Sequence, residues 1–315
     1  MTLRDFLGYG ESQLSASPHP DRAKRDAETL LLHLIGKNKA WLMAHASDDF
    51  AGCTAIRYAG LLERRRKGEP IQYITGETEF YGLPFRVTPD VLIPRPETEH
   101  LVEKVVRLIP ALDRRPKKVF SIRKTHPAFR DGERTQREGD PDQISWPPRV
   151  LDVGTGSGCI AISIAHDWGE ADITAVDSSA SALEVARSNS EKLGFAECIR
   201  FLQGDLLAPV AEERFEIVVS NPPYVPTVDR DSLSVEVRDH EPALALFAGN
   251  DGLDIYSRLI PQAFAALVPG GFIALEIGYA QQPAIHSLLA TAGFTDIQFA
   301  PDLQGIPRVA IARRP

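Results

Sequence analysis

A strand that runs directly into a glycine-rich turn and then a helix constrains the fold of this chain more than any other feature. The strand covers residues 149–153, the turn GTGSG covers 154–158, and a helix is predicted to begin near Cys159. Glycine is needed where a ligand presses against bare backbone. A turn of this kind at the carboxyl end of a buried strand is typical of open α/β sheets that bind a ligand at that edge.

The rest of the C-terminal part alternates between strand and helix. Strands are predicted at 149–153, 172–176, 199–203, 215–220 and 271–276, with helices such as 180–193 and 255–267 in the gaps. This alternation predicts an α/β fold with a mostly parallel sheet covered by helices on both faces. The last two strands, 296–299 and 308–312, are separated only by a turn, so we expect an antiparallel hairpin at the sheet edge.

The N-terminal part has a different pattern. Residues 1–70 carry apolar side chains at helical spacing and are predicted to form a small helical domain that binds a partner or covers the active site. The run of positive charge at 64–67 is either a solvated helix end or a substrate-facing patch. Residues 71–92 are rich in β-branched and aromatic residues and predict a β-hairpin linker. A helix should begin near Thr98, and residues 93–315 should form the α/β domain.

Residues 113–140 are expected to be a mobile basic insertion. Nine Lys or Arg stand against four Asp or Glu between 113 and 138, a net charge of +5 in a chain of −8. Few apolar residues and no sustained period occur there. Two interpretations remain open, namely contact with an RNA-rich partner and a solvated insertion without function. The acidic balance of the whole chain argues against a surface that binds nucleic acid throughout.

The cysteines and the hydropathy of the sequence indicate the cellular compartment to expect for this protein. Cys53, Cys159 and Cys198 are far apart, and together with the scattered histidines they suggest neither a disulfide framework nor a metal site. No signal peptide and no apolar run long enough to span a bilayer is evident. We therefore expect no metal, no membrane and a reducing, cytoplasmic location.

Acidic residues stand at or just after the carboxyl ends of three predicted strands. Asp152 ends the first strand, at the edge where open α/β sheets bind ligands. Asp177 ends the second and can accept both hydroxyls of an adenosine ribose. Asp205, beside Leu206, follows the third and would reach an adenine ring, although a helix N-cap is an equal alternative for it. These positions indicate a nucleoside cofactor without choosing between NAD and S-adenosylmethionine.

The residues Asn221-Pro222-Pro223-Tyr224 follow a buried strand directly and indicate the chemistry. The side-chain oxygen of Asn221 and the carbonyl of Pro222 are two acceptors that can hold both N–H bonds of an NH₂ group. Tyr224 can stack on the planar group that bears it. Two prolines stiffen the loop and preorganise these acceptors. The motif therefore predicts S-adenosylmethionine-dependent methylation of a planar amide or amine nitrogen.

At this point the chain resembles the HemK/PrmC family of protein-(glutamine-N5) methyltransferases. The resemblance rests on eight ordered motifs, which are QYITG at 72–76, EFYG at 79–82, LIPRPETE at 92–99, DVGTGSG at 152–158, NPPYV at 221–225, EPAL at 241–244, DGL at 251–253 and EIG at 276–278. The Asn-Pro-Pro-Tyr motif by itself also occurs in N6-adenine methyltransferases. The stretch at 92–99 is far more specific to the HemK/PrmC family. Two departures are Leu206, where some relatives place tryptophan, and the length of 113–140.

The resemblance implies a class I (Rossmann-like) methyltransferase fold with a seven-stranded sheet. It implies that S-adenosylmethionine is converted to S-adenosylhomocysteine as the glutamine of the Gly-Gly-Gln loop of class 1 peptide chain release factors is methylated. The expected cofactor-binding residues are Asp152, Gly154, Thr155, Gly156, Ser157, Gly158, Asp177, Asp205, Leu206 and Asn221. The expected substrate-binding residues are Asn221, Pro222, Pro223 and Tyr224, with Asn221, Pro222 and Tyr224 catalytic.

Several alternatives stay open. N5-glutamine methylation of a ribosomal protein is the nearest, and the stretch at 92–99 favours the release-factor branch. N6-adenine methylation of DNA or RNA would use the same pocket for a flipped base. A nicotinamide oxidoreductase would need GxGxxG spacing, which the turn at 154–158 lacks. A non-catalytic cofactor-binding partner of the translation machinery is argued against by the intact Asn221 and Tyr224. We expect a monomer with no direct nucleic-acid substrate.

Overall fold

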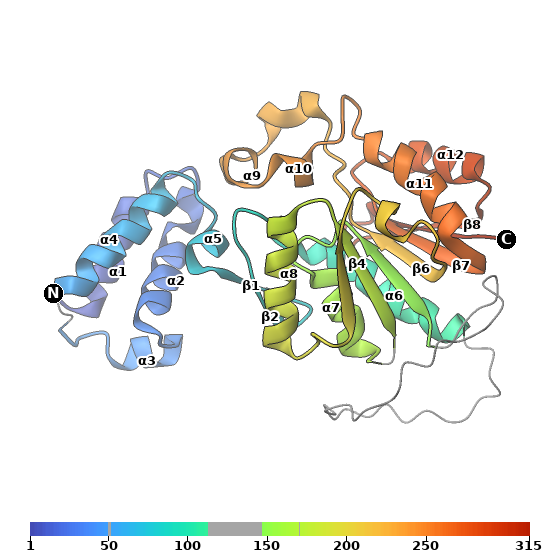
Figure 1. Cartoon of the computed structure of the whole chain (residues 1–315). Coiled ribbons are helices and arrows are strands. Elements are labelled where there is room, and N and C mark those ends of the chain that lie inside the picture. Colours follow the sequence, from blue (N-terminus) through green and yellow to red (C-terminus); the bar gives the residue numbers. More distant parts are fainter. Residues whose placement is uncertain (50–51, 113–146, 170) are drawn as a thin grey trace.

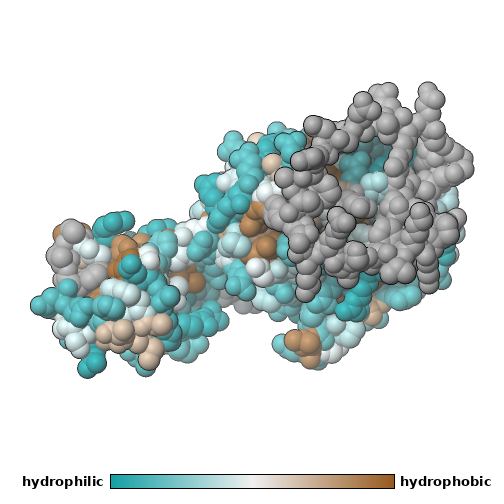
Figure 2. All heavy atoms as spheres, turned by 90° about the horizontal axis from the view of Figure 1, so that it is seen from below, coloured by the Kyte–Doolittle hydropathy of each residue, from teal (hydrophilic) through white to brown (hydrophobic). Residues whose placement is uncertain are grey.

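The computed structural model describes residues 1–49, 52–112, 147–169 and 171–315 (Figure 1). A helical N-terminal domain stands to one side of a larger α/β domain, and the two chain ends lie at opposite extremes of the molecule. The predicted basic insertion at 113–140 lies outside the described residues. No helix in the described ranges has the length and apolar character needed to cross a bilayer. From below, the described surface is mostly hydrophilic, with small separate apolar areas (Figure 2).

The N-terminal domain packs four helices around one apolar core. They are α1 (Leu3–Leu14), α2 (Ala23–Ile35), α3 (Lys39–Ala44) and α4 (Gly52–Arg66), with a 3₁₀ turn η1 (Pro20–Arg22) before α2. Thr2 and Asp5 form a capping box that starts α1. The hydroxyl of Tyr58 crosses the core and donates to the Ala27 carbonyl at 2.9 Å. A side chain at Gly10 would lie 2.2 Å from that hydroxyl, so only glycine leaves room for this contact.

The segment predicted as a hairpin linker is partly helical. The hairpin itself is confirmed as β1 (Glu77–Phe80) and β2 (Leu83–Arg86), but residues 71–75 form a short helix, α5 (Ile71–Thr75), where strand was expected. Pro70 precedes this helix, and Gly76 ends it in the left-handed region, while Tyr73 and Ile74 are buried. Tertiary packing and the glycine stop therefore outweigh the β propensity of the sequence.

The hairpin packs on the α/β domain. Phe80 and Phe85 are buried in the core of that domain. The Asn189 side chain accepts from the Arg86 amide at 2.7 Å and donates to the Ser157 carbonyl at 2.9 Å. One side chain thus connects the hairpin to the glycine-rich turn. The domain boundaries at residues 70 and 92 stay predictions.

The described α/β residues form one seven-stranded sheet in the order β5-β4-β3-β6-β7-β9-β8. The strands are β3 (Arg149–Val153), β4 (Asp172–Asp177), β5 (Ile199–Gln203), β6 (Phe215–Ser220), β7 (Leu267–Glu276), β8 (Thr295–Pro301) and β9 (Pro307–Arg313). Neighbouring strands from β5 to β7 pair in parallel, whereas β9 runs antiparallel to both β7 and β8. The predicted α/β class, the mostly parallel sheet and the antiparallel edge hairpin are confirmed.

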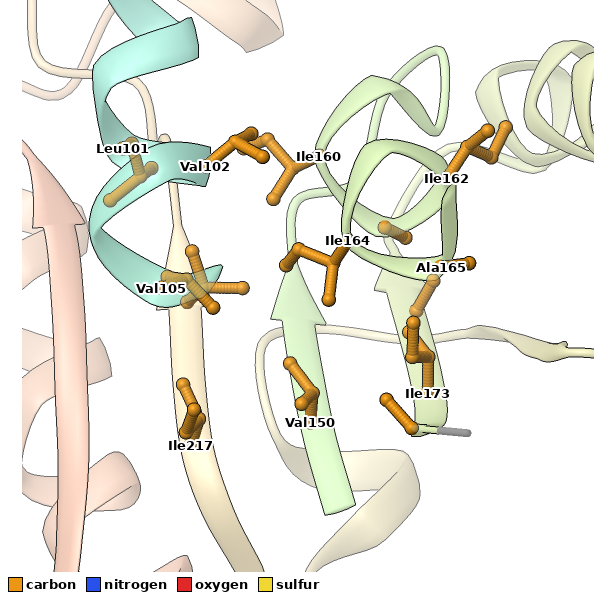
Figure 3. Close-up of a cluster of buried hydrophobic side chains, with 14 of the residues drawn as sticks. Leu101, Val102, Val105, Val150, Ile160, Ile162, Ile164, Ala165, Ile173 and Ile217 are labelled. Carbon is orange, nitrogen blue, oxygen red and sulfur yellow. The ribbon is translucent and has the colours of Figure 1, made fainter. Parts of the chain in front are cut away.

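Helices cover both faces of the sheet. Helices α6 (Pro96–Leu112), α7 (Cys159–Asp167) and α8 (Ala180–Leu193) belong to one face. Figure 3 shows the first two interdigitating with β3, β4 and β6 through aliphatic side chains such as Val105, Ile164 and Ile217. On the other face lie α11 (Asp254–Ala266) and α12 (Gln282–Ala292). Two packed apolar cores of this kind hold the sheet rigid and fix where its strand ends lie.

The strand register brings the predicted site residues to one edge of the sheet. Val153 on β3 lies opposite Val176 on β4 and Ser220 on β6, and Ser220 lies opposite Leu275 on β7. The next residue of each strand therefore stands at the same level, and these residues are Gly154, Asp177, Asn221 and Glu276. Strand order reverses at β3, which is where open α/β sheets bind their ligands.

A buried ion cluster joins the two domains. Arg65 at the end of α4 is 2% exposed, and its guanidinium donates to Asp26 on α2 at 2.7 Å. It also pairs with Glu236 on α9 (Val235–His240), which follows β6 in the α/β domain. The alternative of a solvated helix end is therefore wrong for Arg65, although Arg64 and Arg66 are largely exposed. The helical domain is tied to the segment that follows the Asn-Pro-Pro-Tyr motif.

Candidate active site

A cavity of about 590 Å³ opens at the carboxyl edge of the sheet. The glycine-rich turn and the residues after β4 and β5 line one part of it. Asn221, Pro222 and Pro223 line another part, together with several residues of the segments 89–98 and 242–245, Thr98 among them. The volume is in the range of small-molecule sites, which bury most of their ligand. The cavity therefore joins most of the predicted cofactor residues to three of the four predicted substrate residues.

The glycine-rich turn leaves space beside its backbone. Gly154 and Gly156 line the cavity with positive φ angles of 75° and 56°, and a Cβ on either would meet no atom within 4 Å. Gly158 does not line the cavity. Its Cβ would lie 3.3 Å from the backbone of Ala186, so this glycine lets the turn approach α8. Thr155 and Ser157 line the cavity beside the first two glycines.

Asp177 is placed as expected at the end of β4. It lines the cavity, and its two oxygens accept from the backbone amides of Gly156 at 2.8 Å and Ser179 at 2.9 Å. Burial raises the pKa of this carboxyl, and the backbone N–H groups oppose the rise. A carboxylate fixed in this way retains lone pairs that can accept ribose hydroxyls.

Asp152 is placed differently from the other predicted cofactor residues. It is fully buried beneath the turn and does not line the cavity. One oxygen accepts from the Thr155 hydroxyl at 2.6 Å. Burial raises the pKa of Asp152 to about 7. These contacts assign Asp152 to the shape of the turn rather than to the cavity wall.

Asp205 and Leu206 line the cavity beyond the end of β5. The Asp205 carboxylate pairs with Arg258 of α11, which also lines the cavity. The N-cap alternative for Asp205 is wrong, because the following 3₁₀ turn, η2 (Ala208–Val210), has Leu207 at its N-cap position. Leu206 has a φ of 50°, an uncommon conformation for a non-glycine residue. Sequence reasoning missed Arg258 because helix α11 lies far along the chain.

The Asn-Pro-Pro-Tyr motif divides between the cavity and the core. Asn221, Pro222 and Pro223 line the cavity, whereas Tyr224 does not. Its ring packs on the core cluster under α11, and its hydroxyl donates to Glu276 at 3.2 Å. Burial raises the Tyr224 pKa far above its ordinary value, so the hydroxyl keeps its proton. The predicted stacking of Tyr224 on the substrate stays a prediction.

Two further residues hold the motif in place, and one of them, Thr98, also lines the cavity. Thr98 in the first turn of α6 accepts from the Asn221 amide nitrogen at 3.1 Å. Its own hydroxyl lies 2.6 Å from Glu276, the last residue of β7. Sequence reasoning gave neither residue a role. The signal for Glu276 was present, since it ends an apolar strand in the same way as Asp177 does.

An ion pair closes one side of the cavity. Arg95, which lines the cavity, donates to both oxygens of the buried Glu241 at 2.6 and 2.7 Å. The pair links the rigid Pro-Arg-Pro segment before α6 to the loop after α9. The motifs at 92–99 and 241–244 therefore meet in space. Within the described ranges, no group of three or more His, Cys, Asp or Glu side chains is arranged to hold a metal ion.

Comparison with known proteins identifies the family. A family model described as the PrmC N-terminal domain matches residues 5–76, and one described as the methyltransferase small domain matches 144–236. A release factor glutamine methyltransferase of Koribacter versatilis is 37% identical over all of this chain and 99% of its own length. The chain belongs to the release factor glutamine methyltransferase family. The namesake of Moorella thermoacetica is 38% identical, again over 100% of this chain and 99% of its own.

A solved structure supports the fold of this family member. The catalytic domain of hMettl16 superimposes with a TM-score of 0.52 over 84% of this chain and 82% of its own, at 14% identity. Likeness at that level of identity bears on fold alone, and it agrees with the class I methyltransferase architecture predicted from the sequence. The relatives' names favour neither of the alternative substrates, a ribosomal protein or adenine.

Proposed function

We propose that this chain transfers the methyl group of S-adenosylmethionine to the side-chain amide nitrogen (N5) of the glutamine in the Gly-Gly-Gln motif of class 1 peptide chain release factors. The observation that carries the proposal is one cavity lined both by a glycine-rich turn and by Asn221 and Pro222. Membership of the family supports the choice of substrate.

The cavity residues fit the cofactor. Open space beside Gly154 and Gly156 can take an elongated ligand against the backbone, and Asp177 stands where ribose hydroxyls can be accepted. Asp205, Leu206 and Arg258 would bound the adenine end. S-adenosylmethionine supplies an electrophilic methyl group on a sulfonium and leaves as S-adenosylhomocysteine.

The residues around Asn221 can compensate for the low nucleophilicity of the glutamine amide nitrogen. An amide nitrogen is a poor nucleophile because its lone pair is delocalised into the carbonyl. Asn221 Oδ1 and the Pro222 carbonyl would accept the two N–H bonds of the glutamine, which raises electron density on nitrogen and stabilises the positive charge that develops there. Holding the nitrogen in line with the methyl carbon contributes several kcal/mol, up to roughly 7–11 kcal/mol in favourable cases.

Proton removal needs no strong base. A nitrogen–carbon bond forms as the carbon–sulfur bond breaks, and the methylated nitrogen then carries a positive charge. A protonated amide nitrogen is strongly acidic, so its proton passes to water or to a neighbouring acceptor after transfer. The side chains at the site therefore bind and orient the substrate rather than titrate during the step.

The cofactor end of the cavity can be tested with a matched pair of glycines. Gly156→Ala should weaken S-adenosylmethionine binding by about tenfold or more, because overpacking a fitted site costs about 1–3 kcal/mol. Gly36→Ala is the control, since Gly36 caps α2 with a φ of 63° and equally open space. Both variants carry the same backbone strain, so calorimetric titration should separate them. Equal affinities would contradict the placement of the cofactor at the turn.

The substrate assignment is tested by label transfer. The enzyme is incubated with methyl-labelled S-adenosylmethionine and, separately, with a class 1 release factor, its Gln→Ala variant at the Gly-Gly-Gln motif, a ribosomal protein and DNA. We expect label on the intact release factor alone. Label on DNA or RNA, on the ribosomal protein, or persisting on the Gln→Ala variant would overturn the choice.

We further propose a monomeric, cytoplasmic enzyme with no direct nucleic-acid substrate. The described cysteines, Cys159 and Cys198, are free thiols, which suits a reducing compartment. The net charge of −8 disfavours broad contact with nucleic acid. A single chain provides both ends of the cavity.

A further inference from the structure

A chain of hydrogen bonds leads from the cavity into the core. It runs from Asn221 through the hydroxyl of Thr98 to the carboxylate of Glu276, with donor–acceptor distances of 3.1 and 2.6 Å. Thr98 and Glu276 are each 2% exposed. The three residues come from β6, α6 and β7, so the two cores of the α/β domain fix their separation.

The number of protons available along these hydrogen bonds determines which group donates and which accepts at each step. Burial raises the pKa of Glu276 to about 6, so above neutral pH the group is a carboxylate and can only accept. Thr98 has one hydroxyl proton and must give it to Glu276. The Thr98 hydroxyl can then only accept from Asn221. The NH₂ group of Asn221 must therefore face Thr98.

We propose that Glu276 is a positioning residue that acts through Thr98 to hold the Asn221 amide with Nδ2 toward Thr98 and Oδ1 toward the substrate. The inference rests on the proposed function, because an inward NH₂ group matters only if the site must accept N–H bonds. In the reversed orientation the asparagine would present donors to a glutamine NH₂ group that has only donors to offer. One flip of a side-chain amide would therefore abolish the complementarity.

Tyr224 completes the arrangement from the other side of the carboxylate. Its hydroxyl donates to Oε1 of Glu276, while Thr98 occupies Oε2. The carboxylate is thus fixed at both oxygens by neutral donors. This gives the fourth residue of the Asn-Pro-Pro-Tyr motif a role that does not require contact with substrate.

Glu276→Gln is the most informative single change, because it keeps the shape of the side chain. With Tyr224 still donating to the amide oxygen, the new NH₂ group faces Thr98, whose hydroxyl is then free to donate to Asn221 and turn its NH₂ group into the cavity. We expect kcat to fall about 10- to 100-fold, the loss typical of residues that orient a metal ligand, because Glu276 likewise acts by orienting the group that binds. The KM for S-adenosylmethionine should change little.

Thr98→Val should cause a similar loss of kcat. Thr98→Ser, which keeps the hydroxyl, should be at least about tenfold more active than Thr98→Val.

A double variant tests the donor-to-acceptor direction of these hydrogen bonds. Asn221→Asp keeps an acceptor toward the substrate but places a second carboxylate beside Thr98, which has one proton for two acceptors. Adding Glu276→Gln reverses the direction of donation. The amide introduced at position 276 donates to Thr98, and Thr98 donates to the carboxylate introduced at position 221. The double variant N221D/E276Q should therefore be more active than N221D alone. A purely structural role for Glu276 predicts the opposite, because two harmful changes would then accumulate.

The outcomes separate this inference from the proposed function. Wild-type enzyme that fails to methylate the release factor overturns the proposed function. Wild-type enzyme that methylates it, combined with a Glu276→Gln variant of unchanged kcat or a double variant weaker than N221D, overturns the role of Glu276 and leaves the function standing. Circular dichroism melting of each purified variant establishes that the measured protein is folded.

Discussion

Replacing Asn221 with alanine should lower kcat by about 100- to 1000-fold, the usual loss when one preorganised group that stabilises developing charge is removed from an enclosed site. Asn221 lines the cavity, and its amide nitrogen donates to Thr98, which lines the cavity beside it. Truncation leaves the glutamine NH₂ group with one fewer acceptor and without its alignment. The measurement is single-turnover methylation of a release factor at saturating S-adenosylmethionine, with cofactor affinity determined separately by titration.

The matched control is Asn250→Ala. Asn250 is an exposed asparagine in the same domain, before α11 and outside the cavity wall. We expect it to retain the wild-type rate. Near-full kcat in Asn221→Ala, with intact cofactor binding, would show that Asn221 does not have the role assigned to it.

Replacing Arg65 with methionine should destabilise the protein by about 3–5 kcal/mol, the cost typical of removing one partner from a buried ion pair. The change removes the 2.7 Å ion pair of the buried Asp26, which among the described residues keeps only the exposed Arg25 at 3.9 Å, and it removes the Arg65 contact with Glu236, which Arg22 and His19 also contact. Methionine fills a similar volume, so the lost charge rather than a cavity dominates the effect. Thermal or urea unfolding followed by circular dichroism measures it.

The neighbouring arginine provides the control. Arg66 lies on the same helix turn but is exposed, and among the described residues it pairs with the half-exposed Glu63 alone. Exposed pairs contribute little to stability. Arg66→Met should therefore keep nearly the wild-type melting temperature. Similar melting temperatures for the two variants would contradict a buried interdomain ion cluster.

Much of the fold could be predicted because its signals are local. Apolar runs that end in glycine or in an acid identified β3 and β4, and the turn between the last two strands identified the edge hairpin. Residues 71–75 were assigned to strand because their β-branched and aromatic side chains dominate the local pattern. Their helix depends on burial of Tyr73 and Ile74 against other elements, which local pattern does not contain.

The candidate site was predictable only where a residue ends a strand. Asp177 and Asn221 line the cavity because the register of parallel strands places their ends at one level. Thr98 is 123 residues from Asn221 and 178 residues from Glu276, so their contact is a product of tertiary packing. Burial of Asp152 under the turn likewise depends on the fold around it. Sequence spacing therefore indicated the chemistry, and the structure supplied the residues that orient it.

The most direct test of the account is tandem mass spectrometry of a class 1 release factor after incubation with the enzyme and S-adenosylmethionine. We expect one added methyl group on the side chain of the glutamine in the Gly-Gly-Gln peptide, and a much lower yield of it in the same time when Asn221→Ala replaces the wild-type enzyme. An unmodified glutamine, or a methyl group on any other residue of the release factor, would contradict it.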